Sequence, residues 1–190
     1  MSSSVLYMSM SLDGFITGPD DDTSQGLGAG GECLHDWLGD GDDPSVFRPS
    51  GPSAQVYDEL MATGSVLVGR RTFDHAGHWG GDHHGVPIFV PTRGEPAEPA
   101  SDWVHYVTDG VESAMSQAKQ AAGDADVLVH GADLAQSCLR AGVLDELEIH
   151  LIPILLGEGR RLFGDEQLGL ELTRVIDAPG VTHLRYRVAA

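Results

Sequence analysis

Short apolar runs alternate with segments of helical periodicity over most of the chain. Five runs have the length and the β-branched content of buried strands: 5–12, 65–68, 86–91, 103–108 and 125–130. Between them, the segments 53–62, 109–123 and 133–141 repeat apolar residues at i, i+3 and i+4, which predicts amphipathic helices with Asp109 and Asp133 as caps of the last two. Strands that alternate with helices are typical of a parallel sheet.

The last part of the chain has a different pattern. The segments 144–156, 168–176 and 181–188 read as consecutive strands joined by hairpin-like connections that contain glycine and proline. We therefore expect an α/β fold with a central, mostly parallel sheet and an antiparallel C-terminal edge. Neither a repeat nor a linker divides the chain, so a single domain is predicted over residues 1–190.

Residues 18–52 form a long polar segment that is rich in Gly, Asp, Pro and Ser, with one short apolar patch at 33–38 that predicts a brief helix. Long irregular segments in compact domains are often lids or binding loops. The stretch 26–31 matches the dinucleotide-binding pattern GxGxxG, but that motif requires a buried strand before it, and this chain has a polar loop there. A flexible lid is the preferred interpretation.

The amino-acid composition limits the kinds of binding partner that the protein can have. The chain has 190 residues, and its 29 acidic and 11 basic residues give a formal charge of −18. Such an excess of negative charge disfavours nucleic acid and anionic membranes as partners. The cysteines Cys33 and Cys138 lie too far apart for a zinc knuckle, and no secretory leader or membrane span is evident. We expect a cytoplasmic protein.

Four histidines in one glycine-rich stretch, His75, His78, His83 and His84, suggest a metal-dependent enzyme as one hypothesis. Neither an HExxH helix nor a cysteine partner supports this hypothesis, and the acidic runs of the chain lack the ligand spacing of an EF-hand. Incidental histidines on a solvated loop are the preferred interpretation, and no metal site is expected.

Three short turns follow predicted strands and point to a different chemistry. They are Gly69–Thr72, Thr92–Arg93 and Gly131–Asp133. In a parallel sheet the carboxyl ends of the strands meet at one edge, where ligands bind and helix N-termini favour anions. Two of the turns carry arginine in an arginine-poor chain, which favours a cradle for a phosphorylated cofactor. The alternative is that these arginines pair with nearby carboxylates on the surface.

Four motifs in this order resemble one family. They are SLDGFITG at 11–18, VGRRTFD at 68–74, VHGA at 129–132, and the long stretch LRAGVLDELEIHLIPILLGEG at 139–159. Together they resemble the RibD C-terminal-domain reductases, a riboflavin-biosynthesis-like family with the dihydrofolate-reductase-like fold. The resemblance implies helices on both faces of the sheet. It also implies an NADPH-dependent oxidoreductase that transfers hydride to a pterin, a pyrimidine or another heterocyclic small molecule, as 5-amino-6-(5-phosphoribosylamino)uracil reductase and dihydrofolate reductase do.

The resemblance also implies a set of cofactor-binding residues. By position, the turn after 65–68 holds cofactor phosphates, the segment after 86–91 reads the 2′-phosphate, and the turn after 125–130 follows the pyrophosphate. The residues at these positions are Gly69, Arg70, Arg71, Thr72, Thr92, Arg93, Gly131, Ala132 and Leu134. Arginine offers a planar fork of donors to phosphate, and glycine lets the backbone approach closely.

On the substrate side, the family places Asp13 beside the substrate and the nicotinamide, which makes it the candidate catalytic residue. Its alternative is a turn aspartate bonded to its own backbone. Trp37 is a candidate wall under a flat ring, with Asp36, His35 or Glu32 as substrate anchors or proton donors; Trp37 as a plain core residue is the competing interpretation.

The chain departs from the family pattern at two points. His130 stands where relatives usually carry glycine, and the carboxylate that holds the substrate in dihydrofolate reductases has no clear counterpart. A non-catalytic nucleotide-binding or regulatory protein with the same fold is therefore the alternative function. The apolar stretch 145–156 exceeds what one buried strand needs, and it predicts a homodimer interface.

Overall fold

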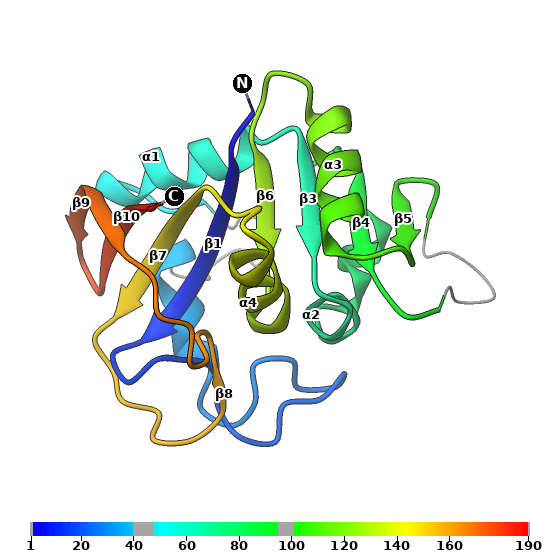
Figure 1. Ribbon diagram of the computed structural model, residues 1–190. Coiled ribbons are helices and arrows are strands. Elements are labelled where there is room, and N and C mark those ends of the chain that lie inside the picture. Colours follow the sequence, from blue (N-terminus) through cyan, green and yellow to red (C-terminus); the bar gives the residue numbers. More distant parts are fainter. Residues whose placement is uncertain (1, 40–47, 95–100, 190) are drawn as a thin grey trace.

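The computed structural model describes residues 2–39, 48–94 and 101–189, and a twisted eight-stranded sheet forms its centre (Figure 1). Along the sheet the strands are β5 (Val104–Val107), β4 (Ile88–Pro91), β3 (Ser65–Val68), β6 (Val127–His130), β1 (Ser4–Ser11), β7 (Glu146–Ile152), β10 (Val181–Val188) and β9 (Leu170–Ala178). Every pair from β5 to β7 is parallel, whereas β10 pairs antiparallel with both β7 and β9. The predicted parallel sheet with an antiparallel C-terminal edge is confirmed.

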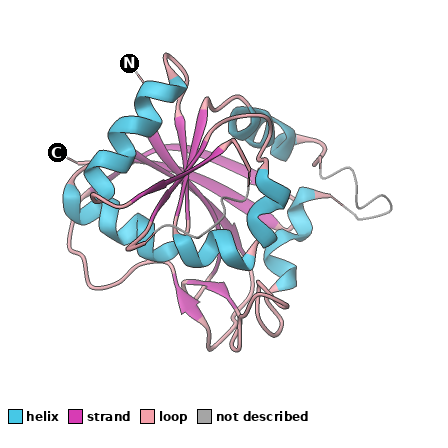
Figure 2. Cartoon of the chain, turned by 90° about the vertical axis from the view of Figure 1, so that its right-hand side faces the viewer, coloured by secondary structure: helices cyan, strands magenta, loops and turns pink. Residues whose placement is uncertain are grey.

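Helices cover both faces of the sheet (Figure 2). On one face, α1 (Pro52–Met61) and α2 (Arg70–His75) bury Val56 and Phe73 against β3, β4 and β6. On the other, α3 (Val111–Ala122) and α4 (Ala132–Ala141) bury Met115 and Cys138. Residues 66–68 of β3 and 127–129 of β6 are continuously apolar because both faces of these inner strands are covered. None of the described helices has the length and apolarity needed to cross a membrane.

A small second sheet joins two distant loops. β2 (Phe15–Thr17), which follows β1, pairs antiparallel with β8 (Arg160–Arg161), which follows β7. Among the described residues, η1 (Glu32–Leu38) is a 3-10 helix, and η2 (Gly77–Gly81) is a short turn in which residues 78–80 have positive φ. The β2–β8 pairing brings the loop after β7 to the end of the sheet where β1, β3 and β6 also finish (Figure 1).

The glycine-rich segment after β2 folds back on itself. The N–H of Gly18 donates to the carbonyl of Leu27, and a Cβ atom on Gly31 would lie 1.9 Å from that same oxygen. These glycines permit close backbone contacts within the loop. The residues directly before the motif, 18–25, form turns and no strand, so the structure agrees with the rejection of a dinucleotide-binding motif.

The predicted helix caps differ from those observed. The residues before α3 and α4 are Gly110 and Gly131, with φ of 107° and 100°, and neither helix has a side-chain cap. Glycine occupies these positions because L side chains rarely adopt such a φ. Asp109 instead accepts a hydrogen bond from Ser113, and Asp133 lies inside the first turn of α4.

The β7 part of the apolar stretch 145–156 is buried within the chain, whereas Leu155 beyond β7 is 72 % exposed. This β7 part lies between β1 and β10, with Leu147 and Ile149 in the core under α3 and α4. At this end of the sheet, exposed apolar side chains lie on the edge strand β9: Leu170 is 44 % exposed, Leu172 52 % and Val175 53 %. The dimer remains a prediction, and β9 becomes the better candidate surface for it.

Two of the strand-end turns touch each other. Gly131, between β6 and α4, has a φ of 100°, and a Cβ atom there would lie 2.4 Å from the hydroxyl oxygen of Thr72 in α2. The N–H of Gly69 donates to the carbonyl of His130 across the same junction. Glycine at 131 is therefore needed for both its backbone conformation and its closeness to α2.

We expect Gly131→Ala to lower the free energy of unfolding by about 2 to 3 kcal/mol, because it adds a steric conflict with Thr72 to the strain of a positive φ. Urea unfolding measures the change. Gly142→Ala is the matched control, since Gly142 has a φ of 66° with no atom near its Cβ position, and we expect about 1 kcal/mol for it. Equal losses for the two variants would show that the Thr72 contact is unimportant.

His83 and His130 pack together beside Trp79 of η2. The sequence did not place either histidine in the interior. The Trp79 ring lies 4.5 Å from the ring of His83 and 5.8 Å from that of His130, measured between centroids. Burial lowers the pKa of His83 to about 3 and that of His130 to about 4. The expected solvated histidine loop is thus wrong for this part of the segment, because aromatic packing holds it against the end of β6.

These buried imidazoles make stability depend on pH. In the unfolded chain their pKa is about 6.5, so the unfolded state binds more protons than the folded state between pH 6.5 and 4. Stability is therefore full above pH 6.5 and decreases as the pH falls, by up to about 1.4 kcal/mol per pH unit for each histidine. Urea unfolding at pH 7.5, 6 and 5 should show a smaller slope for His130→Gln than for the native chain. The exposed His105 provides the control: an unchanged slope in His130→Gln, or an equal change in His105→Gln, would contradict this account.

Candidate functional site

A cleft of about 710 Å³ lies at the carboxyl ends of β3, β4 and β5, and we call it the strand-end cleft. Its walls come from the turn after β3, the turn after β4, the start of α3, the first turns of α4, and β8. The residues that line it are Gly69, Arg70, Arg71, Thr72, Pro91, Thr92, Arg93, Val107, Thr108, Gly110, Val111, Asp133, Leu134, Ser137 and Arg160.

Parallel strand pairing places these residues together. Strand β3 ends at Val68, and extended Gly69 leads directly into α2. The N–H of Thr92 donates to the carbonyl of Val107 at 2.9 Å, which holds the turn after β4 against the end of β5. A Cβ atom on Gly69 would lie 3.4 Å from the Cβ of Leu134, so the C-terminal end of β3 contacts the first turn of α4.

The cleft brings together most of the residues predicted for the cofactor. Seven of the nine line it: Gly69, Arg70, Arg71, Thr72, Thr92, Arg93 and Leu134. The other two, Gly131 and Ala132, do not line it. Ala132 is 2 % exposed, and Gly131 packs against Thr72, so these two shape the site from within the fold.

The cleft gathers four of the 11 basic residues of the chain. Three of these arginines already have acidic partners: Arg70 pairs with Asp74 at 2.9 Å, Arg71 with Asp21 at 3.0 Å, and Arg160 with Asp133. The alternative of local surface pairing is therefore correct for Arg70 and Arg71. Ion pairs this exposed contribute about 1 kcal/mol or less, so an anionic ligand can displace the aspartates.

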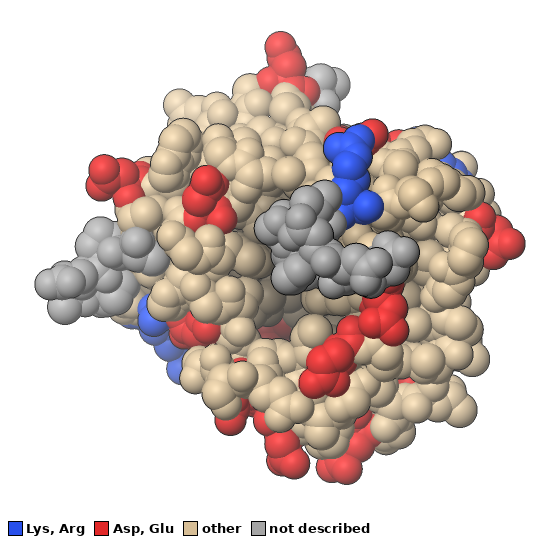
Figure 3. Space-filling model, turned by 180° about the vertical axis from the view of Figure 1, so that it is seen from behind, with Lys and Arg blue, Asp and Glu red and all other residues tan. Residues whose placement is uncertain are grey.

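Arg93 differs from the other three arginines because it forms no ion pair with any residue in the described ranges. The remaining surface is strongly acidic: seen from behind, carboxylates are scattered widely and basic side chains are few (Figure 3). A cluster of cations on such a surface attracts an anion locally while the rest of the molecule repels it.

Sequence analysis missed Arg160. This residue reaches the cleft only because β8 pairs with β2, a contact between segments more than 140 residues apart. A usable signal was present, since two arginines follow the motif that ends at Gly159 in a chain with few basic residues.

Asp13 does not line the strand-end cleft. Its carboxylate accepts hydrogen bonds from the Ser11 hydroxyl at 2.6 Å and from the N–H groups of Leu156 and Gly157 at 3.2 and 2.7 Å. The Ser11 hydrogen bond is the main reason that the pKa of Asp13 is lowered. In this structure Asp13 anchors the loop after β7, so its place favours a structural role over the predicted catalytic one.

Of the predicted substrate residues of η1, Asp36 and Trp37 line a second, smaller cavity of about 270 Å³, which also involves the chain after β7, whereas His35 and Glu32 do not line it. Trp37 is 9 % exposed, packs against Ile152 and Val181, and donates its indole N–H to Ser9 at 2.9 Å, as a core residue does. Asp36 lines the same cavity and is exposed.

Comparison with known proteins agrees with this architecture. The model of the RibD C-terminal domain matches residues 4–178. The Bacillus subtilis (strain 168) protein YwjB is 25 % identical over 170 residues, covering 84 % of this chain and 81 % of its own, and YyaP is 23 % identical over 192 residues, covering 90 % and 85 %.

Solved structures share the fold. A putative riboflavin biosynthesis protein from Shewanella sp. PV-4 superposes with a TM-score of 0.74 at 21 % identity, covering 99 % of both chains. A deaminase/5-amino-6-(5-phosphoribosylamino)uracil reductase from Thermotoga maritima gives 0.65 at 15 %, covering 99 % of this chain and 57 % of that one. Enterococcus faecalis dihydrofolate reductase, complexed with NADP(H), gives 0.63 at 13 %, covering 99 % and 97 %. The chain belongs to the RibD C-terminal domain family and has the α/β fold that this family shares with dihydrofolate reductase.

Proposed function

We propose that this protein is an NADPH-dependent reductase that transfers hydride to a pyrimidine, a pterin or another heterocyclic small molecule. The observation that carries the proposal is the strand-end cleft, in which four arginines of a −18 chain meet at one sheet edge. The reductase named for the Thermotoga relative and the NADP(H) complex of the Enterococcus structure support the same reaction class.

The residues of the cleft suit a phosphorylated nucleotide. Arg93, which lacks an ion pair in the described ranges, offers a planar fork of donors, and Arg70, Arg71 and Arg160 can exchange an aspartate for a phosphate. Extended Gly69 leaves the backbone open to close approach. A volume of about 710 Å³ is within the usual range for small-molecule sites.

These residues indicate what the protein and the cofactor each contribute to the reaction. NADPH supplies the hydride when it is bound, and the chain contributes binding and orientation, which are the main protein contributions in cofactor chemistry. The arginines hold the anionic end at the edge of the sheet. The rigid junction of Gly131 and Thr72 fixes the ends of β6 and α2 relative to each other.

A non-catalytic nucleotide-binding protein is the second candidate. The engagement of Asp13 in loop anchoring favours it, since this removes the acid that the sequence offered for catalysis. Steady NADPH oxidation with any member of a panel of oxidised pterins, pyrimidines and quinones would exclude this candidate. Binding without turnover across the panel would support it.

Arg93→Ala should weaken NADPH binding by about tenfold or more, because a charge-assisted contact to phosphate contributes about 1.5 to 3 kcal/mol. Arg70→Ala and Arg71→Ala should have smaller effects, since each loss is partly offset by the release of a paired aspartate. Calorimetric titration in increasing salt is the measurement, and affinity should fall as salt rises.

The matched control is Arg187→Ala, because Arg187 is an exposed, ion-paired arginine on β10 that does not line the cleft. Its affinity for NADPH should equal that of the native chain. Absence of binding at millimolar NADPH, or equal affinity in Arg93→Ala and the native protein, would remove the proposal.

We also propose that the protein is a cytoplasmic homodimer. The exposed apolar residues of β9 support association, because an unprotected apolar edge strand is a ready site for pairing. Light scattering should give twice the 20.2 kDa of one chain, and Leu172→Glu should shift the mass toward the monomer. Trp103→Gln is the control, since Trp103 is 46 % exposed beside β5 at the opposite edge. A monomeric native chain at micromolar concentration would contradict this prediction.

A further inference from the structure

A buried cluster of one carboxylate and two imidazoles lies on the sheet face that α1 covers. Glu148 and His150 are alternate residues of β7, so they share a face, and His183 of β10 is paired directly opposite His150. Their exposed fractions are 0 %, 2 % and 0 %. None of the three lines the strand-end cleft.

We propose that Glu148, His150 and His183 bind a divalent transition-metal ion, with Zn²⁺ as the best match. One potential ligand atom from each residue lies within 4.8 Å of the other two. Zn²⁺ takes nitrogen and oxygen ligands at about 2.0 to 2.2 Å, so small side-chain rotations would bring the three atoms into its coordination sphere. In the described ranges these are the residues that gather in this way, and the histidines of 75–84 do not.

One carboxylate oxygen of Glu148 has no hydrogen-bond partner among the described residues. The Oε2 atom accepts a hydrogen bond from Arg174 at 3.0 Å, whereas Oε1 is the buried oxygen that lacks one in the described ranges. A buried acceptor without a hydrogen bond destabilises the folded state. A bound cation would satisfy this oxygen.

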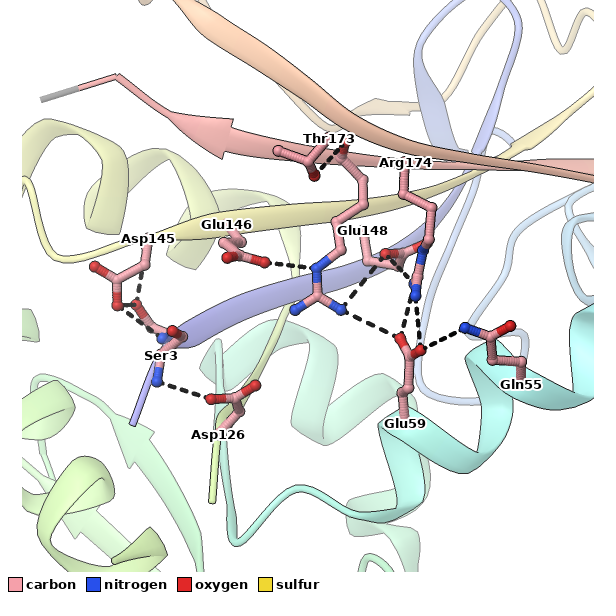
Figure 4. Close-up of polar contacts among 11 residues, drawn as sticks. Ser3, Gln55, Glu59, Asp126, Asp145, Glu146, Glu148, Thr173 and Arg174 are labelled. Atoms are coloured by element: carbon pink, nitrogen blue, oxygen red, sulfur yellow. Dashed lines mark hydrogen bonds and ion pairs between the residues drawn. The ribbon is translucent and has the colours of Figure 1, made fainter. Parts of the chain in front are cut away.

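The charges around Glu148 also favour a cation. Figure 4 shows Arg174 between Glu59 and Glu148. Arg185 pairs with Glu146 at 2.5 Å and with Glu59 at 3.2 Å. Three carboxylates therefore surround two guanidinium groups, which leaves one negative charge in excess. Protonation of Glu148 is the competing way to neutralise this charge.

One of the two histidines has a partner that would orient it as a metal ligand. The Nδ1 atoms of His150 and His183 face each other at 2.9 Å, and Nε2 of His183 lies 3.0 Å from the Ser53 hydroxyl of α1. Histidine ligands of metals usually have such a partner on the second nitrogen, which orients the ring and selects its tautomer. Ser53 is thus a positioning residue for this site.

Trp37 closes the cluster from the outside. Its ring lies 4.5 Å from that of His150 and 4.9 Å from that of His183, and it also lines the second cavity of about 270 Å³. Rotation of this indole would connect the cluster with that cavity and provide an entry path. Three protein ligands leave the fourth position of a tetrahedral Zn²⁺ to a water molecule, which this cavity would supply.

The test uses the full chain without a histidine tag, stripped with EDTA and titrated with Zn²⁺ in a calorimeter. We expect one ion per chain and a dissociation constant below about 1 μM, with at least tenfold weaker binding in Glu148→Gln and His183→Gln. Ser53→Ala should weaken binding about tenfold. His78→Asn is the matched control and should bind as the native chain does, because His78 pairs with Asp74 on the surface.

Far-UV circular dichroism of the metal-free variants checks that they fold. Imidazole NMR signals of the native chain provide a readout that needs no variant: Zn²⁺ should shift those of His150 and His183 and leave that of His78 in place. A folded native chain that does not bind 100 μM Zn²⁺ overturns the proposal and supports a protonated Glu148. Binding that survives in both Glu148→Gln and His183→Gln overturns it as well.

Discussion

Parallel pairing of strands that are buried on both faces is the constraint on which the rest of this structure depends. Because β3, β4, β5 and β6 all run in one direction, their carboxyl ends finish at one edge, and the turns that follow them must share that edge. The helices on either face prevent these turns from folding back over the sheet. The strand-end cleft is therefore a consequence of topology, and the polar residues placed in the turns determine what it can bind.

Much of this arrangement can be predicted from the sequence. The apolar residues 66–68 and 127–129 have no polar face, and only a sheet covered on both sides buries them completely. Turn residues that directly follow such strands, including Arg70 and Arg93, could be placed at the cleft because sequence neighbours of a strand end stay near it. The helix caps were harder to predict, since the steric demand for glycine at Gly110 and Gly131 appears only once the chain direction is known.

The features that escaped prediction depend on contacts between distant segments. Arg160 belongs to the cleft through the β2–β8 pairing, and Asp13 is held by backbone groups beyond β7. The buried cluster could not be recognised in the sequence. Glu148 and His150 follow the ordinary alternation of a strand, and His183 joins them from another strand, 33 residues after His150. In each case the local sequence pattern is ordinary. The residues come together only through the pairing of strands that are distant in the sequence.

The position of β1 in the sheet has a kinetic consequence. This first strand lies between β6 and β7, so that Val5 is paired with Leu128 and Glu146. During synthesis the N-terminal strand therefore has neither of its neighbours until most of the chain has been made. Loops this long are slow to close, and the unpaired apolar strand is exposed to aggregation in the meantime.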